Sequence, residues 1–298
     1  TNKIVNRLMI KTDLQEWNGN YIMKDLPKNE KIRKYLLEFL PEGQVATDDI
    51  SRVMNSYGKS SIEILRARMG NSNEPVDAVV YPDYETVENL VKNADSRKYQ
   101  LVPVGGTTCV TGALEPVKGK IRVSINTRNF RRVELKENYV LMGSGLTGRE
   151  AESILNEYEL TLGNFPESFE HSTLGGWVAT KAIGQESNQY GGIENLVVGI
   201  RMIGSNGYFR DEFAPRNSEG IDVRELAIGS EGRMGLITDV AFKIQKKPER
   251  THFKSYFFKN YEEGIKGLSK MRFHPSIVRL SDEVETSIAL DGEFNSMP

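Results

Sequence analysis

The chain has 298 residues, enough for about two domains at ~150 residues each, and its 39 basic and 41 acidic residues leave a net charge of −2. This balance argues against a nucleic-acid-binding protein that relies on a global positive field. A single cysteine excludes an internal disulfide and favours a reduced, cytoplasmic setting, and three scattered histidines predict no metal site. No apolar run reaches the ~20 residues of a transmembrane helix, which leaves a peripheral membrane association open.

Residues 1–75 are predicted to form a helical N-terminal region. Between Asn29 and Leu40, apolar side chains recur at helical spacing, and Asn29 is a suitable N-cap. Residues 47–55 and 60–69 continue the helical pattern.

After Pro75 the pattern becomes mixed. Residues 76–81 and 100–104 resemble strands, and residues 83–97 between them are predicted to form an amphipathic helix. The loop after Val104 therefore lies at the carboxyl end of a strand, where α/β folds place ligands. Further strands are predicted at 121–125, 132–135, 139–143, 196–203, 207–210 and 236–244. A helix is predicted from a Thr147–Glu150 capping box to Asn156.

The loop Pro103 to Gly112 reads P-V-G-G-T-T-C-V-T-G and has almost no side-chain bulk. Such a loop can present successive backbone amides to a phosphate without a lysine. It matches neither a Walker A motif nor G-x-G-x-x-G. Taken alone, it is equally typical of a tight turn.

Two more small-residue loops follow, S-T-L-G-G-W-V-A at residues 172–179 and G-S-E-G-R-M-G at residues 229–235. Three such loops in one domain indicate a large anionic cofactor that is held over much of its length. A ligand with a pyrophosphate, a sugar and a flat ring would use all three.

In their order, P-V-G-G-T-T-C, E-S-F-E-H-S-T-L-G-G-W-V-A-T-K-A-I-G and G-S-E-G-R-M-G-L-I-T resemble the FAD-linked oxidases of the vanillyl-alcohol-oxidase superfamily. The segments Tyr190–Val198 and Ser276–Asp282 are similar to the alkyldihydroxyacetonephosphate synthase branch. Trp177, in G-G-W-V, favours that branch over D-lactate and glycolate dehydrogenases, which resemble G-G-N-V there. Packing in the core is the alternative role for Trp177. The resemblance covers roughly residues 76–282.

This resemblance implies an α+β fold with a PCMH-type FAD-binding domain at residues 76–250, made of two α/β subdomains at about 76–135 and 136–250. Residues 251–298 would begin a substrate-binding cap domain, with strands at 251–258 and 276–280 and a helix at 261–271. Because family members continue beyond this point, the cap is expected to be partial. FAD is the implied cofactor, bound non-covalently because the first loop has no histidine.

The resemblance also implies the cofactor-binding residues. Residues 103–109 would wrap the pyrophosphate, and residues 167–173 would lie near the middle of FAD and the flavin. Residues 180–183 and 231–237 would add further contacts. Gly106→Asp would abolish binding by placing bulk and negative charge against the phosphates. The implied residues are Pro103, Val104, Gly105, Gly106, Thr107, Thr108, Cys109, Glu167, Ser168, Phe169, Glu170, His171, Ser172, Thr173, Thr180, Lys181, Ala182, Ile183, Glu231, Gly232, Arg233, Met234, Gly235, Leu236 and Ile237.

Several of these residues have alternative interpretations. Lys181 replaces an arginine of the family pattern and lacks its forked geometry. Cys109 is expected to be a small packing residue more than a reactive thiol. His171 is a candidate catalytic contact to flavin or substrate, or a structural histidine. Arg279 is a candidate contact to an anionic substrate, or a surface ion pair with Asp282 or Glu283.

By resemblance, the implied reaction belongs to ether-lipid synthesis: exchange of an acyl for an alkyl group on glycerone phosphate through flavin N5. An FAD-dependent dehydrogenase or oxidase of 2-hydroxy acids, such as D-lactate or glycolate, is the alternative. A catalytically incomplete flavin-binding subunit is the second alternative. The expected partner is a small or lipid-like substrate. A second chain, which includes a homodimer partner, or a missing C-terminal part would complete the active site.

Overall fold

The computed structural model describes residues 26–68, 75–94, 98–115, 119–210, 213 and 222–289. Contacts between Cα atoms divide the chain into two compact units, one within Gly19–Lys247 and one that contains Pro248–Pro298. The two units are taken in turn below. The parts of the predicted N-terminal helical region at residues 1–25 and 69–74 lie outside the described residues, and the domain boundaries at 75 and 250 stay a prediction.

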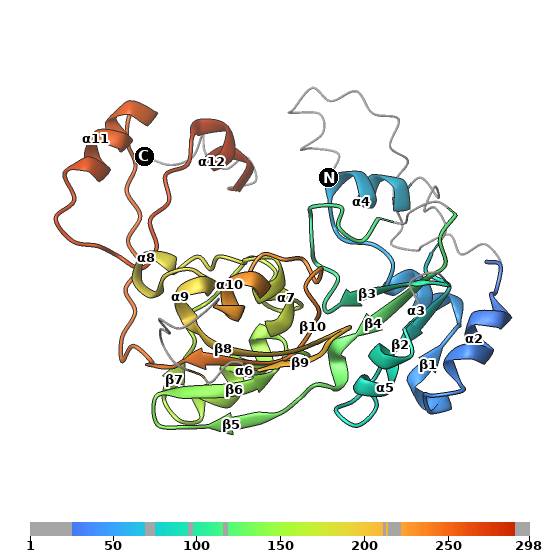
Figure 1. The fold of residues 1–298 in the computed structure, drawn as a ribbon. Helices are drawn as coiled ribbons and strands as arrows, with labels where there is room; N and C mark the ends of the chain where they lie inside the picture. The colour runs from blue at the N-terminus through green and yellow to red at the C-terminus, as the bar shows by residue number, and fades with distance from the viewer. Residues whose placement is uncertain are drawn as a thin grey trace. The chain divides into compact units, whose positions relative to one another are not determined.

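The described N-terminal region of the larger unit is mainly helical and includes one short strand (Figure 1). Helix α2 (Glu30–Leu36) begins as predicted, because the Asn29 side chain accepts a hydrogen bond of 3.2 Å from the Ile32 amide. It ends at Leu36, four residues before the predicted end, where the chain tightens into turns. The elements that follow are η1 (Glu42–Gln44), β1 (Val45–Ala46), α3 (Asp49–Met54) and α4 (Ser61–Arg68).

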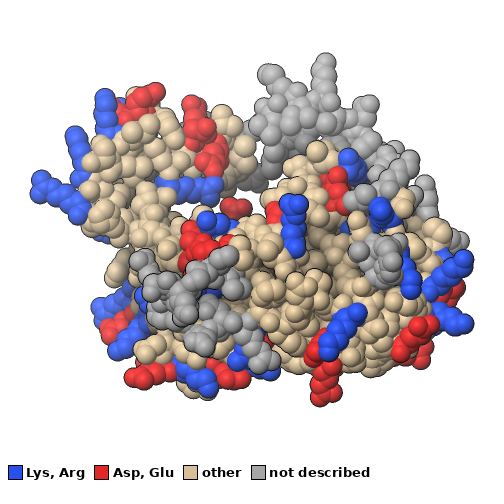
Figure 2. Space-filling view, in the orientation of Figure 1, with Lys and Arg blue, Asp and Glu red and all other residues tan. Residues whose placement is uncertain are grey.

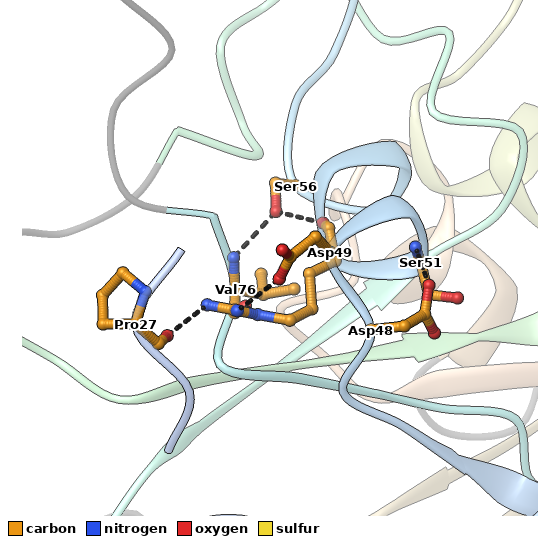
Figure 3. Close-up of polar contacts among 7 residues, drawn as sticks. Pro27, Asp48, Asp49, Ser51, Ser56 and Val76 are labelled. Carbon is orange, nitrogen blue, oxygen red and sulfur yellow. Dashed lines mark hydrogen bonds and ion pairs between the residues drawn. The ribbon is translucent and has the colours of Figure 1, made fainter. Parts of the chain in front are cut away.

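A buried arginine connects this region to the segment that leads into β2, and Figure 3 labels its partners Pro27, Asp49 and Val76. Arg52 of α3 is 3% exposed, and its guanidinium donates to the carbonyl oxygens of Val76 at 2.7 Å and Pro27 at 3.1 Å. The Asp49 carboxylate lies 3.3 Å from the same guanidinium. Since a buried charge is tolerated only when it is paired and hydrogen-bonded, these contacts explain how α3 keeps its place beside β2.

The first sheet has the strand order β1-β2-β4-β3. Strands β2 (Ala78–Val80), β4 (Arg122–Asn126) and β3 (Gln100–Val104) run parallel, and β1 is an antiparallel edge strand. Helix α5 (Val87–Lys92) makes the predicted β-α-β crossover, and its described part is shorter than the prediction. The carboxyl ends of β3 and β4 therefore lie side by side.

The second sheet is antiparallel, with the order β5-β6-β10-β8-β9. Alternate side chains of β6, β8 and β10, such as Val140, Met202 and Phe242, join helices α6, α7 and α9 in one buried cluster. The predicted Thr147–Glu150 capping box is present at the start of α6. The elements are β5 (Val133–Leu135), β6 (Tyr139–Gly143), α6 (Gly148–Asn156), β7 (Leu160–Thr161), α7 (Leu174–Ala179), α8 (Ser187–Tyr190), α9 (Ile193–Leu196), β8 (Val197–Gly204), β9 (Gly207–Arg210), α10 (Val223–Ala227), β10 (Leu236–Lys243) and β11 (Gln245–Lys246).

A polar contact joins the segment between β2 and α5 to the second sheet. The Tyr84 hydroxyl donates a 2.8 Å hydrogen bond to the Asp239 carboxylate of β10, and the Arg132 guanidinium lies 3.4 Å from the same carboxylate. Burial, followed by the Asp239 charge, raises the pKa of Tyr84 well above its usual value. Tyr84 therefore remains a neutral donor that joins the first half of the unit to the second sheet.

A buried carboxyl group predicts a pH-dependent stability. Glu152 of α6 is 5% exposed, accepts hydrogen bonds from the Thr161 hydroxyl and the Leu162 amide, and has a pKa raised by burial. A raised carboxyl pKa means that the folded state binds the proton more tightly, so this group stabilises the fold at low pH. That contribution falls as the pH rises above ~4.3, the usual value, through the folded-state pKa.

We therefore expect Glu152→Gln to gain stability relative to wild type as the pH rises from 4 to 7. Urea midpoints measured across this range test the expectation. A difference between variant and wild type that is independent of pH would contradict it.

The smaller unit contains α11 (Tyr261–Ser269) and α12 (Glu283–Ala289). The predicted helix at 261–271 is thus confirmed, but the predicted strands at 251–258 and 276–280 are wrong, because neither segment is a strand. Both have an apolar pattern typical of strands, and their large side chains are exposed, among them Phe253, Tyr256, Phe257 and Val278. A strand needs a hydrogen-bonding neighbour, and the described residues supply none to either segment.

Charged side chains of both signs are interspersed on the face shown in Figure 2. None of the described helices combines the length and the apolar character needed to span a membrane.

Candidate functional site

A cavity of about 310 Å³ lies in the larger unit, at the small end of the range of about 300–1,000 Å³ for small-molecule sites. Its wall brings together the three small-residue loops that the sequence singled out. The predicted residues in this wall are Pro103, Val104, Gly105, Gly106, Thr107, Thr108, Cys109, Ser168, Ser172, Thr173, Thr180, Ala182, Glu231, Gly232, Gly235, Leu236 and Ile237.

The first loop has backbone amides that the protein does not use. Among the described residues, no group accepts a hydrogen bond from the amides of Gly105, Gly106, Thr107 or Thr108. Thr107 has a left-handed φ of +53°, a conformation that turns neighbouring amides toward one concave anion site. The loop thus has free backbone donors of the kind that bind a phosphate, and the predicted phosphate contact stays a prediction.

Two glycines let this loop contact the second loop at backbone distance. A Cβ atom at Gly105 would lie 2.1 Å from the Thr173 hydroxyl oxygen, and one at Gly106 would lie 1.9 Å from the His171 carbonyl oxygen. Neither position has room for a side chain. The Cβ atom that Gly106→Asp would add therefore meets the backbone at His171, which is a steric cause that the sequence did not show, and the contact of its charge with the phosphates stays a prediction.

Helix α7 contributes to the wall through its side and not through its first amides. The Leu174 and Gly175 amides donate to the carbonyl oxygens of Leu146 and Ser144 at 2.8 and 3.0 Å. Trp177 is 1% exposed, lines the cavity and donates through Nε1 to the Ser172 hydroxyl at 2.8 Å. Trp177 is therefore a core residue and also a residue of the cavity wall, so its packing role and its place in the cofactor loop are compatible.

Backbone strain gathers at this cavity. Five described residues other than glycine have positive φ angles, and three of them, Thr107, Lys181 and Glu231, lie in or next to the loops that form the wall. Such conformations persist where the surroundings over-determine them, and they cluster at ligand sites.

Other predicted residues lie outside the wall. His171 is exposed, Glu170 forms a 2.8 Å ion pair with Arg149, and Phe169 stacks on Trp177 with a centroid distance of 6.4 Å. Phe169 thus supports the wall from behind. The remaining residues in this group are Glu167, Lys181, Ile183, Arg233 and Met234, all exposed.

The wall also contains residues that were not predicted. Thr127 follows β4, and its only sequence signal is its place after a strand of the parallel sheet. Gly175, Gly176 and Trp177 stood inside a glycine-rich loop that had been noted as such. The full additional set is Val110, Thr111, Ala113, Leu114, Thr127, Gly175, Gly176, Trp177 and Ala179.

Cys109 faces the cavity as a poor nucleophile. Burial, with the nearby Glu63 and Glu231 carboxylates, raises the pKa of its thiol. The thiol is therefore protonated at neutral pH, which agrees with a small packing residue.

Arg279 lies in the smaller unit and forms an ion pair with Glu285 of α12, whereas the alternative from the sequence named Asp282 or Glu283. The guanidinium side chain is 67% exposed. Within the described ranges, no three His, Cys, Asp or Glu side chains gather as a metal site would require.

Residues 76–211 match the family described as "FAD binding domain". With the cavity and its unpaired amides, this match defines a flavin-nucleotide-binding protein, and FAD is its cofactor. The chain is homologous to the alkyldihydroxyacetonephosphate synthases: it is 32% identical to the enzyme of Dictyostelium discoideum over 275 residues, which cover 89% of this chain and 45% of that protein. It spans about half the length of the curated synthases that it matches.

A solved alkyldihydroxyacetonephosphate synthase structure has a TM-score of 0.69 and 32% identity, covering 78% of this chain and 43% of that one. The predicted α+β, PCMH-type fold is thereby confirmed. A mitochondrial cytochrome-type D-lactate dehydrogenase of Arabidopsis thaliana is 28% identical over 180 residues, which cover 59% of this chain and 31% of that protein.

Proposed function

We propose that this protein is an FAD-dependent enzyme that exchanges the acyl group of an acylated glycerone phosphate for an alkyl group from a fatty alcohol. The extent of the homology to the synthases carries the proposal. Their alignment covers 89% of the chain, against 59% for the D-lactate dehydrogenase. Because the synthase alignment covers far more of the chain than residues 76–211, much of the agreement with the synthases lies outside the matched FAD binding domain.

In this proposal the first loop holds the pyrophosphate. The four amides of residues 105–108 are already oriented and have no competing acceptor among the described residues, so they bind an anion with little reorganisation. Residues of two other segments, 167–173 and 231–237, line the remainder of the cofactor site, among them Ser168, Thr173 and Ile237. When bound, FAD supplies the N5 atom through which the exchange proceeds.

Arg279 is proposed to contact the phosphate of the substrate. Its partner in the structure is the Glu285 carboxylate, and both side chains are substantially exposed. An exposed ion pair contributes little stability, so a substrate phosphate can replace the carboxylate at small energetic cost. A guanidinium is also suited to bidentate contact with phosphate oxygens.

We propose that further polypeptide completes the substrate site. The exposed apolar side chains of residues 253–284, among them Phe253, Phe257 and Phe273, need a covering partner. Either the continuation of this chain or a second subunit, a second copy included, would supply it. A cytoplasmic setting is part of the proposal, because a reduced compartment suits a single free thiol.

The test uses the full-length protein with its bound flavin. Incubation with acylglycerone phosphate and labelled hexadecanol is expected to release fatty acid and form labelled alkylglycerone phosphate. Rapid anaerobic bleaching of the flavin by D-lactate or glycolate, without exchange, would replace the proposal with a 2-hydroxy-acid dehydrogenase. Retained flavin with neither activity, also after addition of a candidate partner subunit, would replace it with an idle flavin-binding subunit.

A further inference from the structure

One residue of the cavity wall has a buried hydroxyl without a partner. Thr127 is 6% exposed, and its Oγ1 atom makes no hydrogen bond within the described part of the chain. Buried polar groups are nearly always paired, so each exception needs a physical explanation. A ligand that fills the cavity would be such an explanation.

The fold holds Thr127 beside the phosphate loop. Val104 pairs with Asn126 in the parallel β3–β4 ladder, so the next residues of the two strands, Gly105 and Thr127, leave the sheet at the same edge. The backbone at Thr127 has little freedom to move. Its carbonyl oxygen accepts from the Phe130 amide at 2.9 Å, and a Cβ at Gly145 would lie only 2.0 Å from that oxygen.

A second buried hydroxyl provides a contrast. Ser144 is fully buried, and its Oγ atom also has no partner among the described residues. It lies behind Gly175, whose Cβ would be 3.4 Å from this oxygen, and it is not part of the cavity wall. The two hydroxyl oxygens are alike in burial, but only Thr127 is a residue of the cavity wall.

We propose that Thr127 is a cofactor-binding residue whose hydroxyl hydrogen-bonds to FAD. The proposal rests on FAD occupying this cavity and not on the reaction that the enzyme performs. It has a consequence that a purely structural threonine lacks: the hydroxyl is unfavourable in the FAD-free protein and favourable in the complex. Removing it therefore affects the two states in opposite directions.

The experiment compares Thr127→Val, Thr127→Ser and Ser144→Ala in the full chain after FAD is removed. FAD titration by flavin fluorescence gives the dissociation constant, and melting of the FAD-free protein gives its stability. Thr127→Val is expected to raise the dissociation constant about tenfold, equivalent to ~1.4 kcal/mol, with an unchanged or higher melting temperature without FAD. Thr127→Ser and Ser144→Ala are expected to bind FAD within about threefold of wild type.

Wild-type affinity in Thr127→Val would overturn the proposal. So would an equal loss of affinity in Ser144→Ala, because it would assign the effect to the packing of the wall. If the wild-type chain itself bound no FAD, the occupancy of the cavity would be refuted, and this outcome is recognised before any variant is compared.

Discussion

A single methyl group at position 106 is expected to lower FAD affinity by more than 100-fold. In Gly106→Ala the new Cβ would lie 1.9 Å from the His171 carbonyl oxygen. Because the new Cβ is attached to one backbone segment and meets the carbonyl of another, no side-chain rotation can relieve the contact. The first loop therefore has to move away from the second loop. Each charge-assisted hydrogen bond lost from the amides of residues 105–108 weakens binding by about 1.5–3 kcal/mol, or roughly 10- to 100-fold.

The measurement is FAD titration of the refolded or FAD-stripped variant, with circular dichroism to confirm the fold. Gly43→Ala is the matched control, because nothing lies within 4 Å of its added Cβ and it is remote in sequence from the loops of the wall. A folded Gly106→Ala protein that binds FAD like wild type would refute the role of the first loop. An equal loss in Gly43→Ala would show a global effect instead.

Trp177→Ala is expected to cause the largest loss of stability, about 3–5 kcal/mol, typical for removal of a buried tryptophan. The indole is 1% exposed, stacks on Phe169 and hydrogen-bonds to the Ser172 hydroxyl. Its loss leaves a void in the core cluster of the second sheet and leaves Ser172 without its donor. At about 2–4 °C per kcal/mol, the melting temperature should fall by roughly 10 °C.

Urea unfolding monitored by circular dichroism measures this loss. Tyr158→Ala is the control, since that side chain is 59% exposed and surface substitutions usually stay within about ±0.5 kcal/mol. A change below 1 kcal/mol in Trp177→Ala would mean that the wall closes around the missing ring, contrary to the dense packing seen here. The loss of stability in Trp177→Phe should lie between those of Trp177→Ala and Tyr158→Ala, because phenylalanine restores most of the volume but not the hydrogen bond to Ser172.

The reliable predictions from the sequence were those with a local physical cause. The Thr147–Glu150 box and the Asn29 cap were both found because each satisfies free amides within one turn. The strands predicted at 196–203 and 207–210 likewise pair as β8 and β9, across a short Asn206-Gly207 turn whose sequence is typical of hairpins. The lack of side-chain bulk at residues 105–108 is also a local property, but the phosphate contact predicted from it stays a prediction.

Features that depend on distant partners were harder to predict. The residues at 251–258 alternate like a strand, but alternation supplies no neighbour to pair with, and no strand forms. Nothing in the sequence shows that Gly105 contacts Thr173, or that Thr127 joins the same wall, because both follow from the parallel pairing of β3 with β4 and the approach of a separate loop. Trp177 was noted for its motif, whereas its hydrogen bond to Ser172 became clear only in three dimensions.

The left-handed backbone at Thr107, Lys181 and Glu231 has a consequence for how the protein ages. Each such residue raises the free energy of the folded state by about 1–2 kcal/mol, and a ligand that contacts these segments opposes their relaxation. We therefore expect the FAD-free protein to unfold at a lower temperature than the FAD-bound protein, and added FAD to slow inactivation during storage.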